Sequence, residues 1–173
     1  MAARPSIKSA RTAGLLRRRT LVIAWVTVAV GTLHFLDHVI RGYYVVDRGL
    51  DPSWNHSGWP FMSEFTPFTA SLIGVYGLLG AGIWLTSRGR VAGHWFVTSL
   101  LLGALVVWVH FVGAPAETPA GIYRSWANPV AGVVAVANTF AVIAAVLGLG
   151  VNAVVLAGRS GGRVGGRDVL RGR

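Results

Sequence analysis

Four long apolar runs divide the chain, and short polar segments separate them. The runs begin near Thr20, Pro67, Val91 and Pro129, and each continues for about 20 residues or more. A helix needs about 20 predominantly apolar residues to cross the hydrocarbon core of a bilayer. The pattern therefore predicts an all-α membrane protein. The predicted transmembrane helices are residues 20–46, 67–86, 91–112 and 129–156.

Local signals support these boundaries. Thr66 and Asn128 each precede a proline, and a capping residue followed by proline is typical of a helix start. The first run is too long for the apolar part of a signal peptide, and no small-residue cleavage site follows it. We therefore interpret it as an uncleaved transmembrane helix.

The other segments are two loops and two terminal tails. Residues 1–19 form a basic tail, residues 47–66 and 113–128 form outer loops, and residues 157–173 are rich in glycine and arginine. The last segment has no apolar pattern, and we predict that it is disordered. The spans and loops together make one transmembrane domain, residues 20–156.

The charge distribution predicts an orientation. Thirteen of the sixteen Lys and Arg residues lie in the two tails and the turn at residues 87–90. Segments enriched in Lys and Arg stay on the cytoplasmic side of a membrane. We therefore expect an up-down-up-down bundle with both termini cytoplasmic, in a cell (inner or plasma) membrane.

Composition narrows the class further. Only 13% of the residues are charged, against about 25% in soluble domains. The absence of cysteine excludes disulfides, iron–sulfur clusters and cysteine-type zinc sites. The formal net charge is +10, and the basic tails favour anionic lipid headgroups as partners over nucleic acid. One lysine among many arginines, with abundant Ala, Gly and Val, is typical of a bacterial protein with high-GC coding.

Ionisable residues gather at the outer end of the first helix. His34, Asp37, His38 and Arg41 follow the spacing i, i+3, i+4 and i+7, so they share one helical face. His110, about 18 residues from the inner end of the third helix, is predicted at a similar depth. Three histidines at one depth make a candidate metal site.

Two interpretations of this cluster remain open. His34, His38 and His110 suit Zn, Cu or Fe, with Asp37 as a further ligand or as an acceptor for an imidazole N–H. A haem between two of the histidines is a variant of this hypothesis. Arg41 lies beside the cluster, and the loop residues His56 and Glu64 are candidates to join it. In the alternative, Asp37 pairs with Arg41 and the histidines form hydrogen bonds between helices.

Small residues predict where helices approach closely. Ala70, Gly74, Gly77 and Ala81 form a stripe that we expect to pack against a helix of the bundle or of a second copy. Asn138, near mid-bilayer, is predicted to form hydrogen bonds between helices.

The architecture resembles that of many small bacterial four-helix membrane proteins. The missing cysteines exclude the quinone-reducing four-helix enzymes of the vitamin K type. The sequence contains no nucleotide motif and no soluble catalytic domain, so it favours a protein that is not an enzyme.

Three functions remain as hypotheses. The first is an accessory or structural membrane subunit, in a larger membrane complex or a homo-oligomer. The second is an outer-leaflet protein that binds a transition metal or haem. The third is a small oligomeric transporter.

Overall fold

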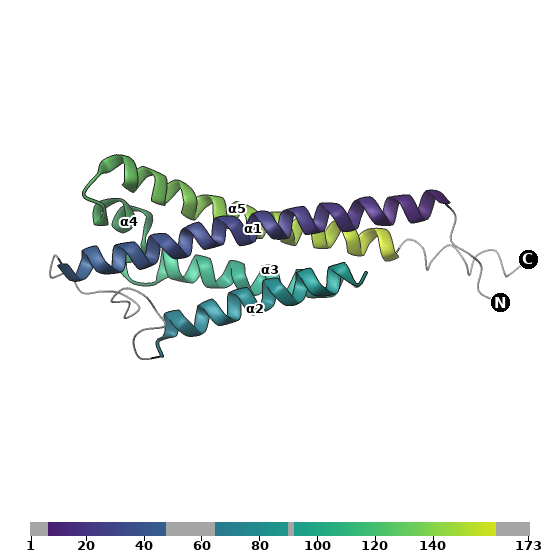
Figure 1. The fold of residues 1–173 in the computed structure, drawn as a ribbon, viewed down its shortest axis with the longest axis horizontal. Coiled ribbons are helices and arrows are strands. Elements are labelled where there is room, and N and C mark those ends of the chain that lie inside the picture. The colour runs from purple at the N-terminus through teal and green to yellow at the C-terminus, as the bar shows by residue number, and fades with distance from the viewer. Residues whose placement is uncertain (1–6, 48–64, 90–91, 162–173) are drawn as a thin grey trace, which may run out of the picture.

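The computed structural model describes residues 7–47, 65–89 and 92–161, with side chains for 12–42, 65–89 and 93–157. Every regular element in these ranges is helical (Figure 1). The elements are α1 (Ile7–Asp47), α2 (Pro67–Ser87), α3 (Ala92–Val107), a π-helical turn (Trp108–Val112), a 3₁₀ turn (Pro115–Glu117), α4 (Pro119–Ser125) and α5 (Pro129–Gly161). His56, Glu64 and the predicted disorder of residues 162–173 lie outside the described residues.

Four of the helices are long and apolar enough to cross a membrane, as the sequence predicts. Their apolar segments are Thr12–Gly42, Pro67–Ser87, Gly93–Val112 and Pro129–Ala157. Much of their outer surface is made of large apolar side chains: Phe96, Leu100, Phe111, Val133, Phe140 and Leu147 are all at least half exposed. Such an outer surface suits contact with lipid chains better than contact with water.

Capping residues start the helices where the sequence predicts. The Thr66 hydroxyl accepts a hydrogen bond from the Thr69 backbone N–H at 3.2 Å, and Pro67 follows it as the first residue of α2. Asn128 Oδ1 accepts from Val130 N at 2.8 Å at the start of α5. Each side chain satisfies a backbone donor that has no partner within its helix.

Two helices are longer than predicted. α1 begins at Ile7 instead of residue 20, so the basic segment at residues 17–19 continues the helix. Arginine is a good helix former, so the charged residues at 17–19 interrupt the apolar run but do not interrupt the helix. α5 similarly continues to Gly161, beyond the predicted end at residue 156.

The segment predicted as the second outer loop is also more ordered than expected. Residues 113–128 contain the 3₁₀ turn and α4, whose N-cap Thr118 accepts a hydrogen bond from Gly121 N at 3.2 Å. Thr118-Pro119 is the same cap-and-proline signal that marks the starts of α2 and α5. α4 packs against α5 at this end of the molecule (Figure 1).

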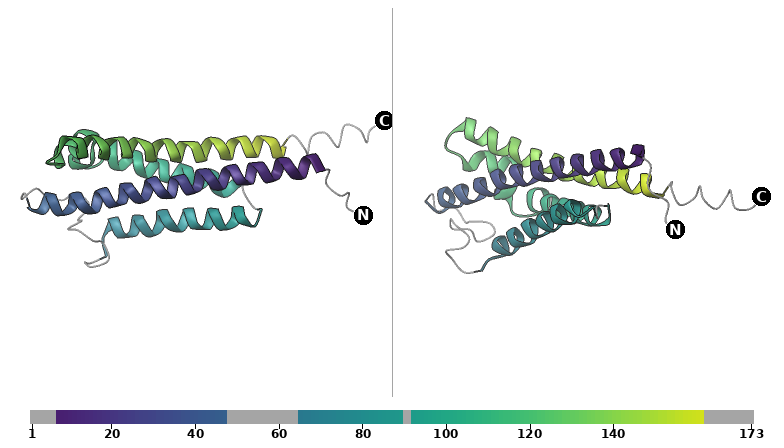
Figure 2. Two further views of the ribbon diagram at one scale, coloured as in Figure 1. Left: turned by 45° about the horizontal axis from the view of Figure 1, so that its top comes forward. Right: turned by 45° about the vertical axis from the view of Figure 1, so that its right-hand side comes forward.

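The four long helices form an elongated bundle. α5 packs along α1 and α3, and α2 packs along α1 and α3 on the other side (Figure 2). α1 begins at the same end of the bundle at which α5 ends (Figure 1). The main buried cluster lies between α1, α2, α3 and α5 and contains Ala24, Leu79, Trp95, Leu102, Val142, Val146, Leu149 and Ala153.

Among the described residues, nothing packs closely against the predicted small-residue stripe on α2. Gly74 and Gly77 are exposed, and a Cβ at either position would meet no atom within 4 Å. The close approach between α2 and α3 is at Gly82 instead, where a Cβ would lie 2.6 Å from the Trp95 ring. The stripe is therefore free of close helix contacts within residues 7–47, 65–89 and 92–161.

An asparagine joins two helices, although it is not the predicted one. Asn152 is 1% exposed, and its Nδ2 donates to Thr20 Oγ1 at 2.8 Å, which connects α5 to α1. The predicted residue, Asn138, is partly buried on the same helix. Buried Thr20 and Thr27 donate to carbonyls four residues earlier, so their hydroxyls are satisfied without water.

Candidate metal centre

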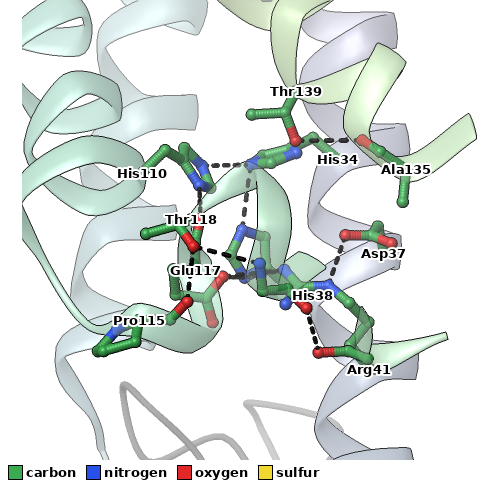
Figure 3. A network of polar contacts seen from close by, with 12 residues as sticks. His34, Asp37, His38, Arg41, His110, Pro115, Glu117, Thr118, Ala135 and Thr139 are labelled. Carbon is green, nitrogen blue, oxygen red and sulfur yellow. Dashed lines mark hydrogen bonds and ion pairs between the residues drawn. The ribbon is translucent and has the colours of Figure 1, made fainter. Parts of the chain in front are cut away.

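Three imidazole nitrogens converge between α1 and the π-helical turn. His34 Nε2 lies 3.0 Å from His110 Nε2 and 3.0 Å from His38 Nε2 (Figure 3). The ligand atoms of the three residues all lie within 4.8 Å of one another. The structure thus brings together the three histidines that the sequence selects.

The local fold of each helix places these rings. His34 and His38 are one turn apart on α1 and present their rings on the same side. His110 lies in the π-helical turn, which ends with a hydrogen bond of 2.7 Å from Gly113 N to Trp108 O. Such turns rotate a side chain relative to a regular helix and occur frequently at functional sites.

A backbone contact sets the orientation of His110. Its Nδ1 lies 2.7 Å from the carbonyl oxygen of Glu117, which can only accept a hydrogen bond. We therefore assign the ring proton to Nδ1, which leaves the Nε2 lone pair directed toward His34. This is the tautomer that a metal-binding imidazole needs.

His38 meets a carboxylate on its far side. Its Nδ1 lies 3.4 Å from Glu117 Oε2 and 3.3 Å from Arg41 Nη2. A carboxylate behind an imidazole fixes the ring and makes the opposite nitrogen a better ligand. Glu117 therefore contacts two of the three histidines, one through its side chain and one through its backbone.

Arg41 joins the cluster to the segment after α3. Its Nε donates to Asp37 Oδ2 at 2.8 Å, and its Nη2 donates to Glu117 Oε2 at 2.9 Å. Trp126 Nε1 donates to the other oxygen of Asp37 at 3.0 Å. The Asp37–Arg41 pair predicted from the i,i+4 spacing is present, and Asp37 uses both carboxylate oxygens in this network instead of facing the histidines.

The charged network is buried. Asp37, Arg41 and Glu117 are 7%, 2% and 1% exposed. When all three are ionised, two carboxylates face one guanidinium. Electrostatic interactions are strong where the local dielectric is low, so this imbalance favours a cation among the neighbouring histidines.

Neutral histidines alone cannot satisfy both close nitrogen contacts. A neutral ring nitrogen holds either a proton or a lone pair, so His34 Nε2 can donate one hydrogen bond or accept hydrogen bonds, but not both. With the protons of His110 and His38 on Nδ1, both of their Nε2 atoms present lone pairs, and the single proton that His34 Nε2 can hold points at only one of them. A cation at the centre removes the conflict because it takes all three lone pairs.

The spacing of the nitrogens fits a small metal ion after a minor adjustment. Tetrahedral coordination with metal–nitrogen bonds of about 2.0–2.1 Å holds the ligand nitrogens about 3.3 Å apart. The two 3.0 Å separations therefore need to widen by a few tenths of an ångström, and the third, between His38 and His110, lies within 4.8 Å and has to approach the same value. Phe68, at the start of α2, packs its ring 5.6 Å from that of His38 and helps to exclude water.

A haem between the histidines does not fit this arrangement. The His34 ring meets the His38 and His110 rings edge-on, with centroids 4.6 and 4.9 Å apart. Direct contact between the rings leaves no space for a macrocycle between two axial nitrogens. The residues therefore suit a single ion.

Two residues of the site, Glu117 and Trp126, were not predicted from the sequence. Both lie in the predicted outer loop, more than 75 residues from Arg41 and Asp37 in the chain. One available signal was that Glu117 is the only acidic residue between Glu64 and Asp168. An isolated acid between two apolar runs is a natural partner for the arginine within the first run.

In comparisons of the chain with protein-family models, curated proteins and solved structures, none matches.

Proposed function

We propose that this chain is an integral membrane protein that binds one transition-metal ion through His34, His38 and His110. The convergence of three Nε2 atoms, with two contacts of 3.0 Å, carries this proposal. The two-carboxylate network behind them supports it, because it supplies negative charge and fixes two of the rings. Imidazole ligands suit Zn, Cu and Fe, and three of them leave a tetrahedral ion one open position.

The proposed orientation places the site near the outer face of a cell membrane. The Lys and Arg distribution favours cytoplasmic termini, and the histidines lie toward the opposite end of α1. An ion there would act as a Lewis acid toward a bound ligand. The chain's own part is to hold three neutral imidazoles in place and to exclude water.

The direct test is metal analysis of protein purified without a polyhistidine tag. We expect about one equivalent of Zn, Cu or Fe per chain in the wild type, and a loss in His38→Ala of at least about ten-fold in affinity. The matched control is His94→Ala, because His94 lies on α3 and bonds to Thr98 and the Leu78 carbonyl, away from the cluster. His94→Ala should bind metal as tightly as the wild type does, and a wild type with no metal above the buffer blank would contradict the proposal.

A second candidate function is that of a subunit in a larger assembly. The outward-facing small residues Gly74 and Gly77 favour this role, because they leave the α2 surface open to close approach by another helix. The Gly77→Leu variant should then change oligomer size in detergent or the set of co-purifying proteins. Unchanged assembly in that variant would remove this support. The transporter hypothesis remains a prediction from the sequence.

A further inference from the structure

An apolar pocket lies directly beside the three histidines. It has a volume of about 110 Å³ and is partly open. Its walls come from α1, α2, α3 with the π-helical turn, and α5, so it lies inside the bundle. The wall residues next to the metal site are His34, His38, His110, Phe35, Phe68 and Val109.

The rest of the pocket is lined almost entirely by carbon. α2 contributes Leu72, Val75 and Tyr76 to this part of the wall, and α3 contributes Leu105 and Val106. The Tyr76 hydroxyl lies 2.9 Å from Thr32 Oγ1 and is therefore engaged with α1. A cavity with such walls stays dry, because water entering it would lose most of its hydrogen bonds.

The size of the pocket sets an upper limit on its occupant. An engineered protein cavity of about 150 Å³ with similar walls binds benzene or xenon. A pocket of about 110 Å³ accordingly accepts the end of an aliphatic chain or a molecule near the size of one small ring. Because the surrounding helices suit a bilayer, such molecules are available at high local concentration in lipid.

Gly31 keeps the pocket wide on the α1 side. It lines the pocket one turn inward from His34 and Phe35, and a Cβ there would meet no atom within 4 Å. The first carbon of a side chain at this position therefore has open space around it.

We propose that the pocket admits the aliphatic end of a lipid-soluble molecule whose single donor atom, such as an alcohol oxygen, takes the open position of the ion. This inference rests on the metal binding proposed above. The three histidines form one wall of the pocket, so a chain seated there lies next to the ion. The apolar walls select against charged or highly polar ligands, because these would lose their hydration without gaining partners.

The test is photolabelling of the full chain in lipid vesicles with an aliphatic alcohol that carries a diazirine, in zinc-loaded and metal-free samples. Mass spectrometry then identifies the labelled residues. We expect label on the pocket residues Tyr76 and Val106, and excess non-reactive alcohol should suppress it. Ile73 and Phe111, which are exposed on the outside of the bundle, should also be labelled, but excess non-reactive alcohol should not suppress that labelling. Zinc should increase pocket labelling in the wild type and not in His38→Ala.

Two glycine variants provide the matched comparison. Gly31→Leu fills the pocket and should reduce pocket labelling about ten-fold, the effect expected when an occupant is excluded by over-packing. Gly80→Leu adds the same side chain on the exposed face of α2, where a Cβ also meets nothing within 4 Å, and should leave it unchanged. If Gly31→Leu fails to fold, suppression of the wild-type pocket labelling by excess non-reactive alcohol still tests whether the pocket is occupied.

The outcomes separate this inference from the metal proposal. Absence of saturable label on Tyr76 and Val106, while Ile73 is labelled, would overturn the pocket assignment even if zinc binds. Saturable pocket labelling that zinc does not change would overturn the donor-atom contact and leave the metal site intact. A wild type that binds no zinc would refute the metal proposal and, with it, the donor-atom contact, whereas the labelling pattern would still decide the pocket.

Discussion

Glu117 connects the histidines to the charged network, since it lies within reach of His38 and Arg41 through one carboxylate oxygen. Its backbone carbonyl meanwhile accepts the His110 Nδ1 proton. The side chain is 1% exposed, so water cannot easily replace it as a partner. Its removal should therefore affect metal affinity although it is not a ligand.

We predict that Glu117→Gln lowers metal affinity by about 10–100-fold, as expected for the loss of a carboxylate behind a metal-binding histidine. The matched control is Asp37→Asn, which also removes one carboxylate from Arg41 but leaves His38 untouched. Competition with a metal indicator dye measures both affinities. Equal losses in the two variants would show that net charge, and not the contact with His38, controls the affinity.

Arg41 should matter for stability. Arg41→Gln would leave the carboxylates of Asp37 and Glu117 buried with a weaker partner, and breaking such a buried pair costs about 3–5 kcal/mol. Thermal unfolding in detergent should show the loss at neutral pH. The double variant Arg41→Met with Glu117→Gln should recover part of it, because it removes charge of both signs. A stable Arg41→Gln variant would contradict the structural role of the pair.

Residue spacing predicted one half of this site and not the other. His34, Asp37, His38 and Arg41 share a face of a single helix, so periodicity alone brings them together. Glu117 and Trp126 reach them only through the path of the chain after α3, which no local spacing specifies. The orientation of Asp37 could not be predicted for the same reason, because one of its carboxylate oxygens accepts from the distant Trp126 indole.

At the level of the helices, contacts between α2 and α3 depend on Gly82. A Cβ there would lie 2.6 Å from the Trp95 ring and 2.9 Å from His94. Trp95 is fully buried and its Nε1 donates to Thr86 Oγ1 at 2.7 Å, so the ring cannot move aside easily. The hairpin therefore needs glycine at this position.

We predict that Gly82→Ala destabilises the protein by about 1–3 kcal/mol, the usual cost of over-packing. Gly80→Ala, on the exposed face of the same helix, is the control and should be neutral or slightly stabilising, because alanine is the better helix former. Both changes can be measured by unfolding in mixed detergent micelles. The opposite ranking would show that the α2–α3 contact differs from the one described.

Helix positions were more predictable than helix contacts. Cap-and-proline pairs mark the starts of α2 and α5 correctly, because they act through neighbouring residues in the chain. The stripe of Gly74 and Gly77 does not mark the α2–α3 contact, because small residues permit close approach on any face of a helix. The contact lies at Gly82, where the Trp95 ring packs against α2. Likewise, the hydrogen bond between α5 and α1 forms at Asn152 and not at Asn138, because Asn152 is the asparagine that lies beside Thr20.

For the whole molecule, the expected orientation rests on charge and not on the fold. The start of α1 and the end of α5 lie at the same end of the bundle (Figure 1). The lengths and apolarity of the helices would allow this end to face either side of a bilayer. We predict that reporters fused at residue 120 and residue 173 read outside and inside, respectively. The reverse pattern would move the metal site to the cytoplasmic face without altering its geometry.

X-ray absorption at the zinc edge shows whether three imidazoles hold one metal ion. For untagged protein loaded with one equivalent of zinc, we predict about three nitrogen scatterers at about 2.0–2.1 Å, with the outer-shell scattering characteristic of imidazole. In His34→Ala this imidazole signal should fall. A zinc environment made of oxygen ligands alone, or a spectrum unchanged in His34→Ala, would contradict metal binding by the three histidines.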